Sequence, residues 1–171
     1  MVHIMPLKVA LAIIVVVLAA SPLACASDPD KLQDFCVAVK DSEASGRDDF
    51  GPYGVSTPHF HPLATEVVTV LEGTVYVGFI DSRNKLCAKM LLPGDIFVLP
   101  KGLIHFLYNT GHRNAAVFAA FGSQNPASIH LPNDIFGSDP PILPEILSKA
   151  FLLDKNVISR IQSQIQSELS E

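Results

Sequence analysis

The sequence predicts an all-β domain, an antiparallel barrel or sandwich, followed by α-helices at its C-terminus. Between residues 66 and 121, short runs rich in β-branched and aromatic residues alternate with turns that contain Gly, Pro, Asp and Asn. After Pro141 the apolar residues recur instead at steps of three and four, which is the period of a helix. The change of period places the helices after the strands.

The first 26 residues have the pattern of a secretory signal peptide. Lys8 precedes an apolar run over residues 9–20, and Ala24-Cys25-Ala26 offers a small-residue cleavage site. A membrane anchor is the alternative, but the run is short of the ~20 apolar residues that a spanning helix needs. We therefore expect residues 1–26 to be cleaved, and residues 27–171 to form one secreted domain without membrane contact.

Charge and cysteine content narrow the choice of partners. The formal net charge is -5, and no block of Lys and Arg occurs, so nucleic acid is not an expected partner. Cys25 leaves with the signal peptide, so Cys36 and Cys87 are the only pair that could form an intrachain disulfide. The sequence alone does not decide whether they do.

The strands are expected in a regular order. Residues 27–53 are polar and rich in turn formers, which predicts an arm with little regular structure. Residues 67–71 and 74–80 flank a turn at Glu72-Gly73, which predicts a hairpin. Further strands are predicted over residues 86–92, 96–99, 103–109 and 115–121, and helices over residues 142–151 and from Val157 to Leu169. The helices could cover this barrel or that of a neighbouring subunit.

A group of histidines with one glutamate offers metal ligands. His59 and His61 lie two residues apart, so a strand places both imidazoles on one face. Glu66 follows at an odd spacing and needs a bend, for which Pro62 gives a reason. His105, in a later strand, could lie opposite. Three imidazoles and a carboxylate suit Mn, Fe, Ni, Cu or Zn and leave two positions of an octahedron open, so the ligands do not select the metal. An H-x-H pair alone is often a pair of ordinary histidines.

Two motifs carry a resemblance to a known family. Residues 58–66 and 71–73, with sequences PHFHPLATE and LEG, resemble the first germin box. Residues 93–106, with sequence PGDIFVLPKGLIHF, resemble the second germin box. Residues 27–38 resemble the mature N-terminus of these proteins, and residues 122–126 and 136–141 match their C-terminal part. The sequence is therefore similar to the germin-like proteins of the cupin superfamily over most of the mature chain.

The resemblance implies a cupin jelly-roll β-barrel with C-terminal α-helices, assembled into homo-oligomers. His59, His61, Glu66 and His105 would be the ligands of Mn2+, and the open positions would take a small oxygen species or a carboxylate. Family members are apoplastic and associated with plant defence, and some dismutate superoxide or oxidise oxalate. His112 and His130 match no ligand position, and we expect both to be ordinary surface histidines.

The sequence also departs from the family. Members normally have several dozen more residues between the Cys36 region and the first box, including a cysteine that pairs with the first one. Here Gly54-Val55-Ser56 runs almost directly into the box, which predicts an incomplete barrel with exposed edges. Oxalate-oxidising germins carry asparagines just upstream of the box, where this chain has Ser56-Thr57-Pro58.

These observations give one main hypothesis and two alternatives. The main hypothesis is a secreted manganese protein with superoxide dismutase-type activity and weak or absent oxalate oxidase activity. The alternatives are a non-catalytic extracellular binding or structural protein, and an inactive truncated product. Metal content and superoxide turnover distinguish the three.

Overall fold

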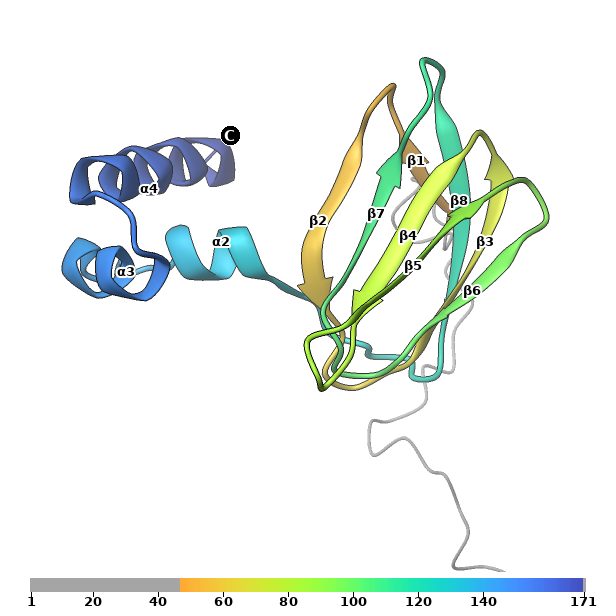
Figure 1. Ribbon diagram of the computed structural model, residues 1–171, viewed down its shortest axis with the longest axis horizontal. Coiled ribbons are helices and arrows are strands. Elements are labelled where there is room, and N and C mark those ends of the chain that lie inside the picture. The colour runs from red at the N-terminus through yellow and green to blue at the C-terminus, as the bar shows by residue number, and fades with distance from the viewer. Residues whose placement is uncertain (1–46, 171) are drawn as a thin grey trace, which may run out of the picture. The chain divides into compact units, whose positions relative to one another are not determined.

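The computed structural model describes residues 47–170, all of which belong to one compact unit. The expected signal peptide and Cys36 lie outside these residues. Two antiparallel β-sheets are followed by helices (Figure 1), so the predicted all-β fold with C-terminal helices is confirmed. The domain boundary at residue 27 stays a prediction.

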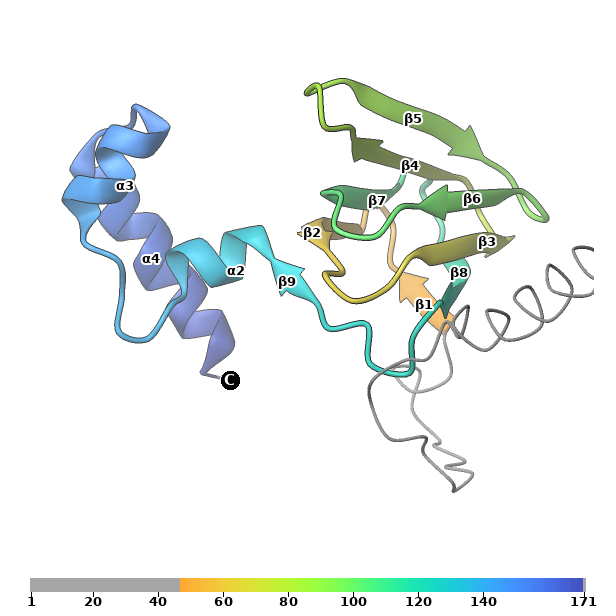
Figure 2. The same cartoon turned by 90° about the horizontal axis from the view of Figure 1, so that it is seen from below.

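The sheets hold four and five strands. The four-stranded sheet has the order β1 (Arg47–Phe50), β8 (Ala115–Phe121), β3 (Glu66–Glu72) and β6 (Ile96–Leu99). The five-stranded sheet has the order β5 (Leu86–Leu91), β4 (Val75–Ile80), β7 (His105–Asn109), β2 (Val55–Phe60) and β9 (Ile129–His130). Figure 2 shows the two sheets face to face. Within the described residues they remain two separately hydrogen-bonded sheets rather than one closed ring.

The hairpin predicted around Glu72-Gly73 is wrong, although both of its strands form. β3 pairs with β6 and β8, whereas β4 pairs with β5 and β7, so the turn carries the chain from one sheet to the other. The register of β3 against β8 shifts between Val70 and Glu72, and such a bulge bends a strand. Gly73 then adopts a φ of 82°, and a Cβ there would approach the Cβ of Ala115 to 2.6 Å. A larger residue would not fit this crossing.

The arm predicted over residues 27–53 is wrong over Arg47–Phe50, which form β1, whereas residues 51–53 form no strand or helix, as predicted. This strand pairs antiparallel with β8, with Asp48 opposite Val117 and Phe50 opposite Ala115. Its adjacent aspartates favour a loop by local propensity, but the ladder offered by β8 outweighs that preference. The next strand, β2, begins at Val55 and contains His59, the first histidine of the predicted site. Within the described residues, β1 is therefore the one strand that precedes the strand carrying His59.

The core fills the space between the sheets with the inward residues of each strand. In β3 these are Val68 and Val70, which alternate with more exposed neighbours as a two-residue period requires. Glu66 occupies the first inward position of the same row. The core residues that are at most 3% exposed include Val68, Val70, Val75, Val77, Leu91, Leu99, Leu107 and Val117. The predicted metal site therefore continues the inward surface of the core.

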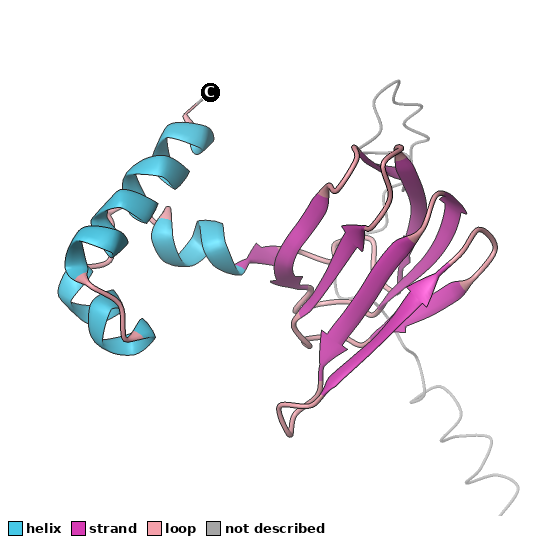
Figure 3. Ribbon diagram, turned by 45° about the horizontal axis from the view of Figure 1, so that its top comes forward, coloured by secondary structure: helices cyan, strands magenta, loops and turns pink. Residues whose placement is uncertain are grey.

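The C-terminal helices are α2 (Leu131–Phe136), α3 (Pro144–Phe151) and α4 (Lys155–Leu169), shown in Figure 3. The last two were predicted from the sequence, and α2 was missed. α3 begins at Pro144, and the Asp154 carboxylate caps α4 by accepting the Asn156 N–H at 2.7 Å. α4 packs against α2 and α3, and α2 contacts β2 and β9. No helix among the described residues is long and apolar enough to cross a membrane.

Candidate metal centre

The structure brings the four predicted residues into one buried group. His59 lies near the end of β2, His61 just after it, and Glu66 and His105 at the starts of β3 and β7. Their side chains are 6%, 6%, 4% and 1% exposed. One candidate ligand atom from each residue lies within 4.8 Å of those of the other three. Residues that are 46 positions apart in the chain thus form a single potential metal-binding group.

Strand pairing explains how they meet. His59 and His105 are register partners in the β2–β7 ladder, which brings the two rings side by side. After Phe60 the chain leaves the five-stranded sheet, and it enters the facing sheet at Glu66. This crossing is the bend that the odd spacing between His61 and Glu66 requires. It allows the carboxylate to approach the imidazoles from the opposite sheet.

Backbone carbonyls fix the orientation of each ring. The Nδ1 atom of His59 lies 2.7 Å from the Thr57 carbonyl oxygen, and that of His105 lies 2.9 Å from the Leu103 oxygen. The Nδ1 atom of His61 bonds to the Ala127 oxygen in the same way. A carbonyl oxygen can only accept, so Nδ1 carries the proton and the neutral ring keeps a free lone pair on Nε2. These bonds are the typical outer support of a metal-binding histidine.

The imidazole Nε2 atoms and Glu66 Oε2 lie close together, and in the neutral rings none of these atoms carries a hydrogen to donate. The Nε2 atoms of His59 and His105 are 3.1 Å apart, and Glu66 Oε2 lies 3.2 Å from Nε2 of both His61 and His105. Glu66 Oε2 is buried and has no hydrogen-bond partner among the described residues when the rings are neutral. Lone pairs that face one another repel, and a buried oxygen without a partner is costly. A cation at the centre removes both penalties, so the residues fit a divalent metal ion.

Titration of the group also suits metal binding. Burial lowers the pKa of His59 to about 4, despite the opposing effect of its hydrogen bond to the Thr57 carbonyl. Burial alone would raise the pKa of Glu66, but His105 and His61 outweigh it and lower that pKa to about 2. Burial likewise opposes protonation of His61, yet Glu66 and the Ala127 carbonyl leave its pKa raised. At neutral pH, His59 is neutral and Glu66 ionised, the forms that bind metals, whereas a metal must displace the proton that the raised pKa of His61 favours.

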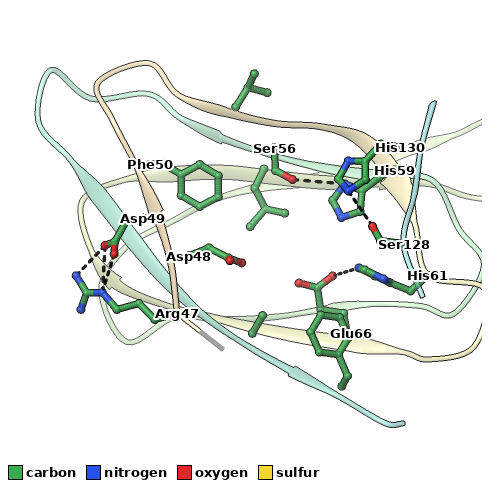
Figure 4. A pocket seen from close by; sticks show the side chains of 14 residues that line it. Arg47, Asp48, Asp49, Phe50, Ser56, His59, His61, Glu66, Ser128 and His130 are labelled. Atoms are coloured by element: carbon green, nitrogen blue, oxygen red, sulfur yellow. Dashed lines mark hydrogen bonds and ion pairs between the residues drawn. The ribbon is translucent and has the colours of Figure 1, made fainter. Parts of the chain in front are cut away.

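A cavity of about 700 Å³ reaches the group (Figure 4). Apolar walls come from Phe50, Leu107 and Ala119. The polar residues that line it include Asp48, Ser56, His59, His61, Glu66, Ser128 and His130. The site is therefore accessible to small molecules although its ligand atoms are buried.

His130 corrects one prediction, because it is not an ordinary surface residue. It is the register partner of His59 in the β2–β9 ladder, and the two rings stack with centroids 4.8 Å apart and planes at 16°. Its Nε2 atom lies 2.9 Å from the Ser128 hydroxyl. A two-residue strand such as β9 leaves no periodic signal, so the sequence could not reveal this contact. His112 is exposed and bonds to the Tyr53 hydroxyl, as expected for a surface histidine.

The fold and the site together define a class of protein. Two antiparallel sheets that enclose three imidazoles and a carboxylate match the cupin family, whose family model covers residues 44–159. The chain belongs to this family. Within it, the chain belongs to the germin-like proteins. It is 53% identical over 119 residues to "Germin-like protein 8-2" of Oryza sativa subsp. japonica, covering 68% of this chain and 54% of that protein.

A second relative spans more of the chain. "Germin-like protein subfamily 1 member 17" of Arabidopsis thaliana is 35% identical over 221 residues, covering 94% of this chain and 100% of that protein. Because this chain has 171 residues, at least 221 − 171 = 50 aligned positions hold none of them. The chain spans about half the length of the first curated relatives it matches. This agrees with the expected loss of a segment of the usual domain.

Solved structures share the fold. "Oxalate oxidase in complex with substrate analogue glycolate" superposes with a TM-score of 0.68 at 40% sequence identity, covering 70% of this chain and 61% of that chain. That protein is an oxalate oxidase with an analogue bound, so a structurally similar cupin can hold a small carboxylate.

Proposed function

We propose that this chain is a secreted manganese-binding germin-like protein whose metal centre reacts with small oxygen species, in the manner of a superoxide dismutase. The observation that carries the proposal is that the ligand atoms of His59, His61, His105 and Glu66 lie within 4.8 Å of one another, with Glu66 Oε2 buried and unpartnered among the described residues. The choice of manganese comes from the family resemblance. The ligands alone do not select it, because they also suit other ions. A bound manganese ion would supply one-electron redox chemistry.

The chain's own residues hold and shield the site. The carbonyls of Thr57, Leu103 and Ala127 keep the three imidazoles in the orientation that binds metal. Four protein ligands leave two positions of an octahedron for small molecules that enter by the cavity. The apolar walls formed by Phe50 and Leu107 lower the local dielectric, which strengthens the electrostatic interactions of a charged ligand near the metal.

Oxalate oxidation is proposed to be weak or absent. Ser56, which lines the cavity, occupies the region where oxalate-oxidising germins carry asparagines. A hydroxyl provides one donor, whereas an asparagine amide provides two donors and an acceptor for a carboxylate and its neighbours. Peroxide production from oxalate by manganese-loaded protein should therefore not exceed that of a metal-free control.

The wider setting follows from the family. We propose apoplastic localisation, a role in plant defence and assembly into homo-oligomers. Exposed apolar side chains on the described helices, among them Ile146, Phe151 and Val157, support assembly through the C-terminal part of the chain. The alternatives, a non-catalytic extracellular protein and an inactive truncated product, draw support from the short length of the chain relative to its relatives.

One experiment tests the proposal against both alternatives. The full chain would be expressed with secretion, purified from the medium, and analysed for metal content and superoxide turnover. About one manganese per chain with turnover above that of the chelated protein is the expected result. Metal without turnover would favour the non-catalytic protein, and secreted folded protein without metal would overturn the proposed function.

A further inference from the structure

Asp48 places an ionisable group on the inward face of β1. It lies opposite Val117, which is fully buried, and shares its face with Phe50 two residues later. Its carboxylate points into the cavity on the side of Glu66 (Figure 4). Asp49, which also lines the cavity, binds the Arg47 guanidinium through its carboxylate at 2.8 Å. Both aspartates are solvent-exposed, and they differ in that only Asp49 has an ion-pair partner among the described residues.

No cation compensates Asp48 within the described residues. Arg47 is the only Lys or Arg among the described residues lining the cavity, and its guanidinium is bonded to Asp49 and lies 3.9 Å from Glu72. No hydrogen-bond or ion-pair partner of the Asp48 carboxylate occurs in residues 47–170. Partial desolvation, and then the charges of Glu66 and Asp49, raise the pKa of Asp48. Asp48 lines the same cavity as Glu66, so its charge faces the space that a ligand of the metal would enter.

The charges determine which ligands the cavity favours. A divalent ion held by three neutral imidazoles and Glu66 would carry a net charge of +1 and attract anions. Asp48 opposes that attraction, and its Coulomb penalty for a dianion is twice the penalty for a monoanion at the same position. Asp48 is solvent-exposed, so water screens part of this repulsion and salt should screen it further.

We propose that Asp48 is a specificity-determining residue that disfavours dicarboxylates at this site and favours neutral or singly charged small molecules. The inference rests on the proposed metal-binding function and specifies its substrate class. It provides a reason for weak oxalate chemistry that is independent of Ser56. It also assigns a role to a residue that lies outside the ligand set.

Charge-removing variants test the proposal in manganese-loaded full-length protein. Asp48→Asn keeps the size of the side chain and removes its charge, and Asp48→Ser removes it with a different shape. Asp81→Asn is the matched control, because it changes the net charge equally at a residue that does not line the cavity. Dissociation constants would be measured by calorimetry for oxalate, a dianion, and azide, a monoanion, with metal content determined on the same samples.

Both Asp48 variants should bind oxalate about tenfold more tightly than the unmodified chain, and azide about threefold more tightly. Asp81→Asn should change neither constant by more than about twofold, and high salt should reduce the gains. Equal oxalate affinity in loaded Asp48 variants and unmodified protein overturns the inference alone. An equal gain in Asp81→Asn would assign the effect to net charge and also overturn it. Failure of all variants and the unmodified chain to take up metal would overturn the proposed function and this inference together.

Discussion

His59 and His105 approach each other with their Nε2 atoms 3.1 Å apart, although 46 positions separate them in the chain. The Nδ1 atom of each ring bonds to a carbonyl two residues before it, Thr57 for His59 and Leu103 for His105. Two strands thus repeat one local arrangement and direct two lone pairs at the same point. Such a contact is unfavourable between neutral rings and favourable around a cation.

Loss of one ligand should therefore greatly weaken metal binding. We expect His105→Ala to lower manganese affinity well over tenfold, because losing even an outer supporting residue typically costs ~10–100-fold. His112→Ala is the control, since His112 is exposed and contacts Tyr53 rather than the site. Competition with a chelator of known affinity measures both variants. Equal metal occupancy in the two variants would contradict the assignment of the site.

His130 should support the site through its stacked ring. Removing it in His130→Ala leaves His59 without the partner at 4.8 Å and should weaken metal binding by roughly tenfold. His130→Phe keeps an aromatic ring against His59 and should restore most of the affinity. If both variants bound metal as tightly as the unmodified chain, the stacking would have no role in holding His59.

The metal-free protein should lose stability as the pH falls. The pKa of His59 is lowered from 6.5 to about 4, so between these values the unfolded chain binds more protons than the folded chain. The contribution of His59 to the free energy of unfolding is at most about 3 kcal/mol, and it is lost as the pH falls from 6.5 to 4. The lowered pKa of Glu66 extends the loss from 4.5 down to about 2, whereas the raised pKa of His61 opposes it by adding stability at low pH.

Urea unfolding in the presence of a chelator measures this dependence. The free energy of unfolding should decrease between pH 7 and pH 4, and His59→Gln, which cannot titrate, should show a shallower decrease. The same slope in His59→Gln as in the unmodified chain would mean that another group dominates.

The secreted protein should contain free thiols. Cys87 is exposed and unpaired in β5, at the edge of the five-stranded sheet, and no other cysteine lies in the described part of the chain. We expect the denatured, unreduced protein to react with two equivalents of a thiol reagent, one at Cys36 and one at Cys87. A preparation without reactive thiols, in which mass spectrometry linked these two cysteines, would refute the expectation.

The sequence predicted those features that depend on short stretches of chain. Strands β3 to β8 follow from short runs of β-branched and aromatic residues between turns. The two-residue spacing pairs His59 with His61, and the family resemblance adds Glu66 and His105. The assignment of strands to sheets did not follow, because the turn at Gly73 has the composition of a hairpin but crosses between sheets. β1 and the stacking of His130 depend on pairing partners distant in sequence, so no local pattern announced them.

Glu66 heads the row of inward side chains in β3 that continues with Val68 and Val70. A slip of β3 by one residue would turn all three to the opposite face at once. The carboxylate would leave the histidines in the same movement that removed both valines from the core. Only molecules whose β3 has paired in the correct register can therefore bind the metal. The amount of bound metal then measures the correctly folded fraction of a preparation.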